Sequence, residues 1–219
     1  EELARDPEGH RERFLALWAQ IAEHYQAYPD DLLFEPLNEP HDSLTAPVWN
    51  QLLQEAIDTI RQTNPTRILV VGPANWNNID ALDSLQLPED DRRLIVTFHY
   101  YNPFQFTHQG AEWVQGSKPW LGTTWTNTPS EERAVIRDLD KAASWAKAHN
   151  RPLYMGEFGA YSKADINSRA RWTSFVARQA EERGISWAYW EFCSGFGVYD
   201  SALKRWNEPL LEALLPPKE

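Results

Sequence analysis

Apolar residues along this chain alternate between helical spacing and short continuous runs. Where apolar side chains recur three or four positions apart, the pattern predicts helices, at residues 8–28, 47–63, 77–85, 130–149, 166–183 and 207–215. Continuous apolar runs rich in β-branched and aromatic residues predict strands, at residues 32–38, 68–72, 94–100, 153–158 and 185–192. A longer loop rich in proline, tryptophan, threonine and glycine occupies residues 102–129.

Strands separated by helices at this spacing are typical of a parallel sheet built from right-handed βα units. A (β/α)8 TIM-type barrel and a doubly wound sheet both fit, and the barrel is preferred because no glycine-rich phosphate loop follows any expected strand. Five strands cannot close an eight-stranded barrel, so this α/β fold is expected to be an incomplete barrel. The strands at 32–38 and 185–192 would have open edges, where Pro36, which has no N–H, is tolerated.

Composition narrows the possible partners. A chain of 219 residues with 42% apolar content predicts one folded domain over residues 1–219. The net charge of −11 disfavours nucleic acid as a partner, and no apolar run is long enough to suggest a membrane span. The single cysteine, Cys193, excludes an internal disulfide and a thiolate metal cluster, and it is expected to be a small buried residue.

Polar and aromatic residues gather where the expected strands end, which in a (β/α)8 barrel is where the chemistry lies. These residues are Asn38, Glu39, His99, Tyr101, Glu157 and Trp190. Two carboxylates at strand ends can break a glycosidic bond, because one gives a proton to the leaving oxygen while the other attacks or supports the sugar carbon. The alternative is that Glu39 caps a helix through the turn at Pro40 and Glu157 is a surface loop residue. The 11 tryptophans offer flat rings for sugar binding, although most are expected to pack in the core.

Four segments carry a more specific signal. They are NEPH at 38–41, FHYYNPFQFTHQGAEW at 98–113, MGEFGAY at 155–161 and SWAYWEFCSGFGVYD at 186–200. In this order they resemble the fourth, sixth, seventh and eighth strand motifs of glycoside hydrolase family 5, the cellulase family, in its thermophile-type endoglucanase and mannanase branch. The resemblance implies an endo-acting β-1,4-glycoside hydrolase with a retaining mechanism, in which Glu39 is the acid/base and Glu157 the nucleophile.

The resemblance also implies supporting roles. Asn38 would bind the sugar 2-hydroxyl, Tyr101 would orient Glu157, His99 would lie near Glu39, and Trp190 would stack under a sugar. Softer candidates for substrate binding lie on the long loop, at His108, Trp113, Trp120 and Trp125. Glu35 and Glu191 are expected to be paired structural carboxylates. The expected substrate is a β-glucan or mannan oligosaccharide, no metal or organic cofactor is required, and the polymeric substrate implies secretion from the cell.

Family members carry three βα units before the NEP strand, with an arginine and a histidine pair that this sequence lacks. Three explanations are open: a truncated gene, completion by a separate amino-terminal segment, or a self-complementing homo-oligomer. Two other functions also stay open. One is an inactive carbohydrate-binding barrel fragment, and the other is a metal-dependent hydrolase using His99, His108 and Glu157.

Overall fold

Parallel strands form the centre of the fold. The computed structural model describes residues 1–216. Its main sheet contains β1 (Leu69–Val71), β2 (Leu94–Tyr100), β3 (Leu153–Phe158) and β4 (Ser186–Tyr189), in the order β1-β2-β3-β4. Strands β1 and β2 pair in parallel, with Leu69 opposite Leu94. A separate antiparallel ribbon joins β5 (Tyr199–Asp200) to β6 (Arg205–Trp206). The α/β alternation and the strand order confirm the predicted fold class.

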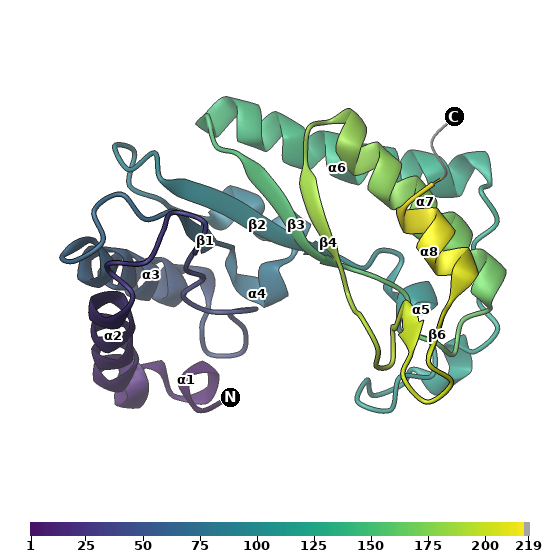
Figure 1. The fold of residues 1–219 in the computed structure, drawn as a ribbon, viewed down its shortest axis with the longest axis horizontal. Helices are drawn as coiled ribbons and strands as arrows, with labels where there is room; N and C mark the ends of the chain where they lie inside the picture. The colour runs from purple at the N-terminus through teal and green to yellow at the C-terminus, as the bar shows by residue number, and fades with distance from the viewer. Residues whose placement is uncertain (217–219) are drawn as a thin grey trace. The chain divides into compact units, whose positions relative to one another are not determined.

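Helices separate the strands as the apolar spacing predicts (Figure 1). The longer ones are α2 (Pro7–His24), α3 (Ala46–Arg61), α6 (Pro129–His149), α7 (Ile166–Glu182) and α8 (Glu208–Leu214). Short helical turns are α1 (Glu2–Arg5), α4 (Ala74–Asn77), η1 (Ile79–Ser84), α5 (Phe104–Thr107) and η2 (Lys118–Trp120). No helix in residues 1–216 combines the length and the apolar character needed to cross a membrane.

Two predictions about local structure were wrong. The strand expected at 32–38 is reduced to one parallel bridge between Phe34 and Leu69. Pro36 explains part of this, because it has no N–H to donate to a neighbouring strand. The side chain of Cys193, expected to be buried, is exposed.

The chain forms two compact units, and each is described by itself. Unit 1 contains Glu1–Phe98 and Trp145–Tyr154, and unit 2 contains His99–Ser144 and the chain from Met155 onward. In unit 1, α2 and α3 pack against each other. The buried face of α3 includes Trp49, whose indole N–H donates a 2.8 Å hydrogen bond to the Gly72 carbonyl just after β1.

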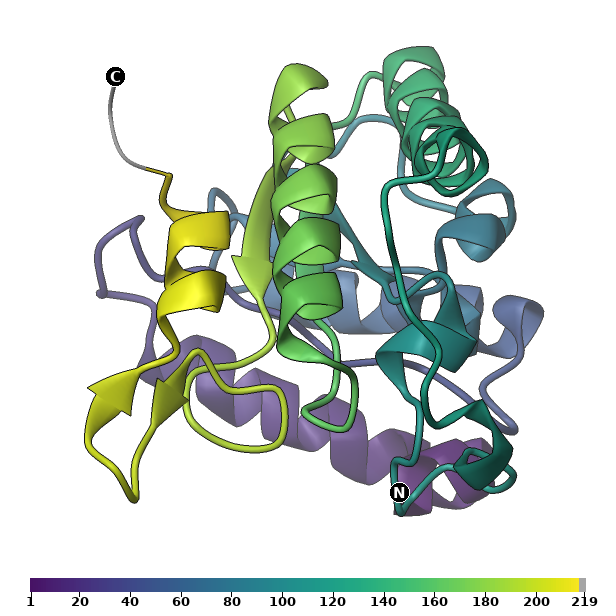
Figure 2. The same cartoon turned by 90° about the vertical axis from the view of Figure 1, so that its right-hand side faces the viewer.

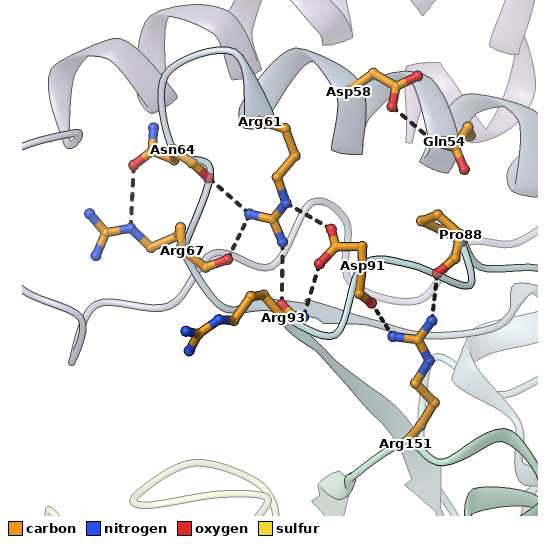
Figure 3. A network of polar contacts seen from close by, with 9 residues as sticks. All are labelled: Gln54, Asp58, Arg61, Asn64, Arg67, Pro88, Asp91, Arg93 and Arg151. Atoms are coloured by element: carbon orange, nitrogen blue, oxygen red, sulfur yellow. Dashed lines mark hydrogen bonds and ion pairs between the residues drawn. The ribbon is translucent and has the colours of Figure 1, made fainter.

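In unit 1, arginine side chains donate hydrogen bonds to main-chain carbonyls of the segments that connect helices and strands (Figure 3). The guanidinium of Arg67, which is only 4% exposed, donates to the main-chain carbonyls of Tyr25, Tyr28, Pro29 and Leu32 at 2.6–2.9 Å. Buried polar groups need such partners to offset their lost hydration. The arginine thereby holds the segment that runs from the end of α2 toward Phe34.

A second arginine joins the segment before β2 to α3. Arg61 Nε donates to Asp91 at 2.7 Å, and its guanidinium also reaches the carbonyls of Asn64 and Arg67. Burial raises the pKa of Asp91, but the hydrogen bonds from Arg61 and from the Arg93 amide outweigh it, so the pKa lies below its ordinary value. Arg151 donates to the main-chain carbonyls of Asp91 and Pro88 (Figure 3).

Unit 2 has its own aromatic core. Helices α7 and α8 lie side by side (Figure 2). Trp172 of α7 is fully buried, stacks on Tyr100 with ring centroids 6.3 Å apart, and donates from its indole N–H to the Asn102 carbonyl. Helix α6 begins with a capping box, in which the Glu131 carboxylate accepts from the Thr128 amide at 2.7 Å.

Candidate active site

Glu157 lies near the end of β3 and is contacted by His99 of the neighbouring strand β2 and by Tyr101, which directly follows that strand. The Tyr101 hydroxyl donates a 2.8 Å hydrogen bond to Glu157 Oε2, and His99 Nδ1 lies 3.5 Å from the same oxygen. Residues two apart on a strand point to the same face, which explains why His99 and Tyr101 both reach this carboxylate. Tyr100 points the other way, into the core against Trp172. Glu157 is therefore an oriented, half-buried carboxylate rather than a surface residue.

The segment after β2 surrounds Tyr101 with aromatic rings. His108 is buried, stacks on Phe104 at 4.1 Å, and meets Tyr101 edge-on at 4.9 Å. Its Nδ1 lies 2.9 Å from the Thr107 hydroxyl. Trp113 is 60% exposed, so its indole ring can meet a ligand in solvent.

Two other loop tryptophans differ from Trp113. Trp125 is only 1% exposed and packs on Phe175, so it belongs to the core and offers no ring to a sugar. Trp120 is half-buried and meets Phe104 edge-on. Of the softer candidates on the long loop, Trp113 is therefore the one whose exposure best fits substrate binding.

Trp190 stands at the end of β4 and is 45% exposed. Its amide donates to the Phe158 carbonyl at 2.9 Å, which ties it to the strand that bears Glu157. The next residue, Glu191, uses its carboxylate to accept from the amides of Cys193, Ser194 and Phe196. Glu191 therefore stabilises the loop after β4. It was expected to be a paired carboxylate, and its partners here are main-chain amides.

In unit 1, Asn38 and Glu39 follow the bridge at Phe34. Asn38 is exposed, and Glu39 is half-buried with a φ of 50°, in the left-handed region that non-glycine residues seldom adopt. Such strain persists only where the surroundings enforce it, and it is common at active sites. Here His41 Nδ1 lies 2.5 Å from the Glu39 carbonyl, and the His41 ring stacks on Trp76 at 5.2 Å.

Trp76 is a candidate that the sequence analysis missed. Asn75, Trp76 and Asn77 have φ values of 62°, 58° and 51°, a left-handed turn that leaves Trp76 49% exposed. The Trp76 amide also donates to the Pro40 carbonyl, beside Glu39. A signal was present, because asparagine tolerates the left-handed region better than most residues and two asparagines flank this tryptophan.

In unit 2, the residues around Glu157 combine an oriented carboxylate, a tyrosine and histidine that contact it, and an exposed tryptophan, Trp190, at the end of a strand. This combination is typical of a carbohydrate-active hydrolase of the α/β class. The family model for cellulase, glycosyl hydrolase family 5, matches residues 3–195, and the chain belongs to that family.

Named relatives agree with this assignment. Endoglucanase H of Acetivibrio thermocellus is 34% identical over 221 residues, covering 98% of this chain and 23% of the relative. Cellodextrinase A of Ruminococcus flavefaciens is 31% identical and is covered over 54% of its length. The structure of endoglucanase Cel5A from the hyperthermophile Thermotoga maritima matches with a TM-score of 0.96 and 55% identity, covering 98% of this chain and 69% of that one. The chain thus corresponds to part of a larger (β/α)8 domain, which confirms the predicted partial barrel.

Proposed function

We propose that this chain carries the active-site machinery of a retaining, endo-acting β-1,4-glycoside hydrolase. The observation that best supports the proposal is the 2.8 Å hydrogen bond from Tyr101 to Glu157, which aims a carboxylate at one position near a strand end. Glu157 is assigned as the nucleophile that attacks the anomeric carbon. A donated hydrogen bond stabilises the ionised carboxylate, which is the form that attacks.

Glu39 is assigned as the acid/base. It would protonate the leaving oxygen first and then take a proton from the water that releases the glycosyl-enzyme, as retention requires. In this mechanism the two carboxyl groups stand about 5–5.5 Å apart. The left-handed backbone at Glu39 supports the assignment because strain of this kind marks functional positions. Asn38 is assigned to the sugar 2-hydroxyl, and His99 to influence proton transfer by Glu39.

The substrate is proposed to be a β-1,4-glucan, with mannan as a second substrate. Three half-exposed tryptophans, Trp76, Trp113 and Trp190, offer ring faces to the C–H surfaces of pyranoses. Cel5A of T. maritima has been solved with cellobiose and with mannotriose, and the second of these structures is 54% identical to this chain. The two carboxylates supply the chemistry without a cofactor, and a polymeric substrate places the proposed enzyme outside the cell.

A carbohydrate-binding role without turnover is the second candidate. The exposed tryptophans favour it, because they would bind a sugar whether or not the carboxylates work. We also propose that a second copy of the chain, or a separate amino-terminal segment, pairs with β4, which ends the sheet order within residues 1–216. Hydrolysis of an aryl cellobioside separates the two functions: the enzyme releases the phenol, whereas the binding module only retains the glycoside.

Substitution of each carboxylate tests the role assignment. Glu157→Ala should abolish turnover of an aryl cellobioside, and azide should restore it with inverted product, because a small anion can attack where the carboxylate did. Glu39→Ala should keep more activity on substrates with good leaving groups, which need little acid help. Glu35→Ala, which removes a nearby exposed carboxylate, is the matched control. Equal behaviour of the Glu157 and Glu39 variants on an activated glycoside would refute the assignment.

A further inference from the structure

Tyr161 lies three residues beyond β3, and its contacts join this strand to the long loop at 102–129. Its amide donates to the Thr107 carbonyl at 2.8 Å, and its hydroxyl donates to Glu112 Oε2 at 2.7 Å. Its ring meets the Trp113 ring edge-on, with centroids 4.9 Å apart. Tyr161 therefore contacts both Trp113 and the residue before it.

The loop after β4 also packs against Tyr161. The Phe196 ring lies 5.4 Å from the Tyr161 ring, and the Ser162 amide donates to the Gly195 carbonyl. A Cβ atom placed on Gly195 would meet Tyr161 Cε2 at 2.5 Å, closer than real side chains approach. The tyrosine ring is therefore confined by packing, and its hydroxyl is directed at Glu112.

The orientation of the Trp113 ring depends on the aromatic rings that surround it. It is 60% exposed, and its ring contacts with Tyr161, His108 and Phe196 are perpendicular or tilted rather than parallel. In such contacts one ring turns its edge to the other and none of these three rings is stacked flat on Trp113, and with 60% of the residue exposed its indole keeps surface for a ligand. An exposed tryptophan on a loop otherwise has several rotamers, and ordering it on binding lowers the affinity.

Glu112 is suited to act as an anchor. The Tyr161 hydroxyl is the main influence that lowers the pKa of Glu112, with Lys163 adding to it, so the carboxylate is ionised at neutral pH. Hydrogen bonds to an ionised acceptor are stronger than neutral ones. Lys163 Nζ lies 3.6 Å from the other Glu112 oxygen, but both side chains are about half exposed and such pairs contribute little.

We propose that Tyr161 is a positioning residue for substrate binding: its hydroxyl holds Glu112 and thereby fixes the Trp113 ring for stacking on a pyranose of a bound β-1,4-linked oligosaccharide. This rests on the proposed function only in taking Trp113 as a sugar contact. Tyr161 is then expected to affect affinity for long substrates and to leave bond cleavage itself unchanged.

Tyr161→Phe removes only the hydroxyl and tests the proposal. Loss of one solvent-exposed hydrogen bond, which contributes in the range of an ordinary one, predicts about a three- to tenfold weaker Kd for cellohexaose, measured by calorimetry in the Glu157→Gln background to prevent hydrolysis. In the chain with Glu157 intact, KM for cellohexaose should rise by the same factor, while kcat on an aryl cellobioside stays the same. Glu112→Gln should behave similarly. Tyr28→Phe, at a half-exposed tyrosine of unit 1, and Lys163→Met should have little effect.

Fluorine NMR of 5-fluorotryptophan protein adds a readout that does not depend on sugar. Trp113→Phe assigns the Trp113 resonance, and Tyr161→Phe should shift or broaden that resonance without moving the Trp172 signal from the core. An unchanged Trp113 resonance would overturn the inference. The inference would also be overturned if Tyr161→Phe bound cellohexaose with normal affinity while Trp113→Ala bound it weakly. If Trp113→Ala itself binds cellohexaose normally, the sugar contact assumed in the proposed function is wrong, and the positioning role is lost with it.

Discussion

At the scale of single residues, the lack of a side chain at Gly159 lets the loop after β3 approach the main chain of Trp190 closely. Residue 159 is glycine, and a Cβ atom placed there would meet the main-chain oxygen of Trp190 at 2.2 Å. The Trp190 amide already bonds to the Phe158 carbonyl, so the backbone cannot retreat without losing that bond. Gly159 therefore sets the position of Trp190 relative to the strand that carries Glu157.

Gly159→Ala is expected to destabilise the fold by about 1–3 kcal/mol through overpacking. It should also lower affinity for cello-oligosaccharides, because Trp190 is displaced. Chemical denaturation and calorimetry measure the two effects. The control is Gly116→Ala, where the added Cβ meets nothing within 4 Å and only the φ of 81° opposes it. Native stability together with native sugar affinity in Gly159→Ala would contradict this account.

The sequence was enough to predict which residues at strand ends form the candidate site. It was not enough to predict the backbone conformation of the residues around them. Glu157, Tyr101 and His99 follow from the period of two along a strand together with the family motif. The left-handed turn that exposes Trp76 has no such period, and it depends on packing, because Asn77 lies where a Cβ on Gly72 would meet it at 2.4 Å. The exposure of Trp113 and the burial of Trp125 also depend on tertiary contacts.

At the scale of elements, the polar network around Asp91 connects α3 to the segment that leads into β2 (Figure 3). The lowered pKa of Asp91 makes this connection sensitive to pH. A carboxyl group with a depressed folded pKa contributes stability above its unfolded pKa of about 3.9, and that stability is lost as the pH falls through the folded value.

Asp91→Asn should therefore reduce the free energy of unfolding by about 1–2 kcal/mol at neutral pH. The difference from the unaltered chain should disappear at a pH below the folded pKa of Asp91, where the carboxyl group is protonated. Urea denaturation at several pH values measures this. Asp90→Asn, at the exposed neighbouring carboxylate, should show no comparable dependence. A deficit that stays constant down to strongly acidic pH would mean that the charge of Asp91 is not the cause.

The long helices could be predicted from sequence because the apolar residues that recur at helical spacing are the residues that the helices bury. Helices α3, α6 and α7 begin and end within a few residues of the expected positions, since proline, asparagine or glycine marks most of their ends. The segment 32–38 has strand composition but is described with one bridge, at Phe34, and the hydrogen bond from Arg67 to the Leu32 carbonyl comes from far along the sequence, where no local pattern could predict it. The β5–β6 ribbon, two residues a side, was too short for any periodic signal.

At the scale of the whole molecule, β4 lies at the end of the sheet order within the described residues. Its residues are exposed or half-exposed, whereas every residue of β1 is buried. An edge strand of this kind presents N–H and C=O groups that can pair with another chain.

We expect the isolated chain to form a dimer or larger assembly through β4, measured by light scattering at several concentrations. Ser186→Lys should shift the distribution toward monomer, because a charge on an edge strand opposes pairing. Ser201→Lys, in the exposed turn of the β5–β6 ribbon, is the matched control. A monodisperse monomer that melts cooperatively would contradict the expectation.

The exposed thiol of Cys193 bears on how such measurements are made. It is the single cysteine among 219 residues, and it lies three positions after Trp190. Air oxidation can join two chains through it, so an apparent dimer counts as strand pairing only when a reductant leaves it intact. The same thiol accepts one maleimide dye at one known place. A fluorophore attached there would report, by its change in emission, when an oligosaccharide reaches the loop that carries Trp190.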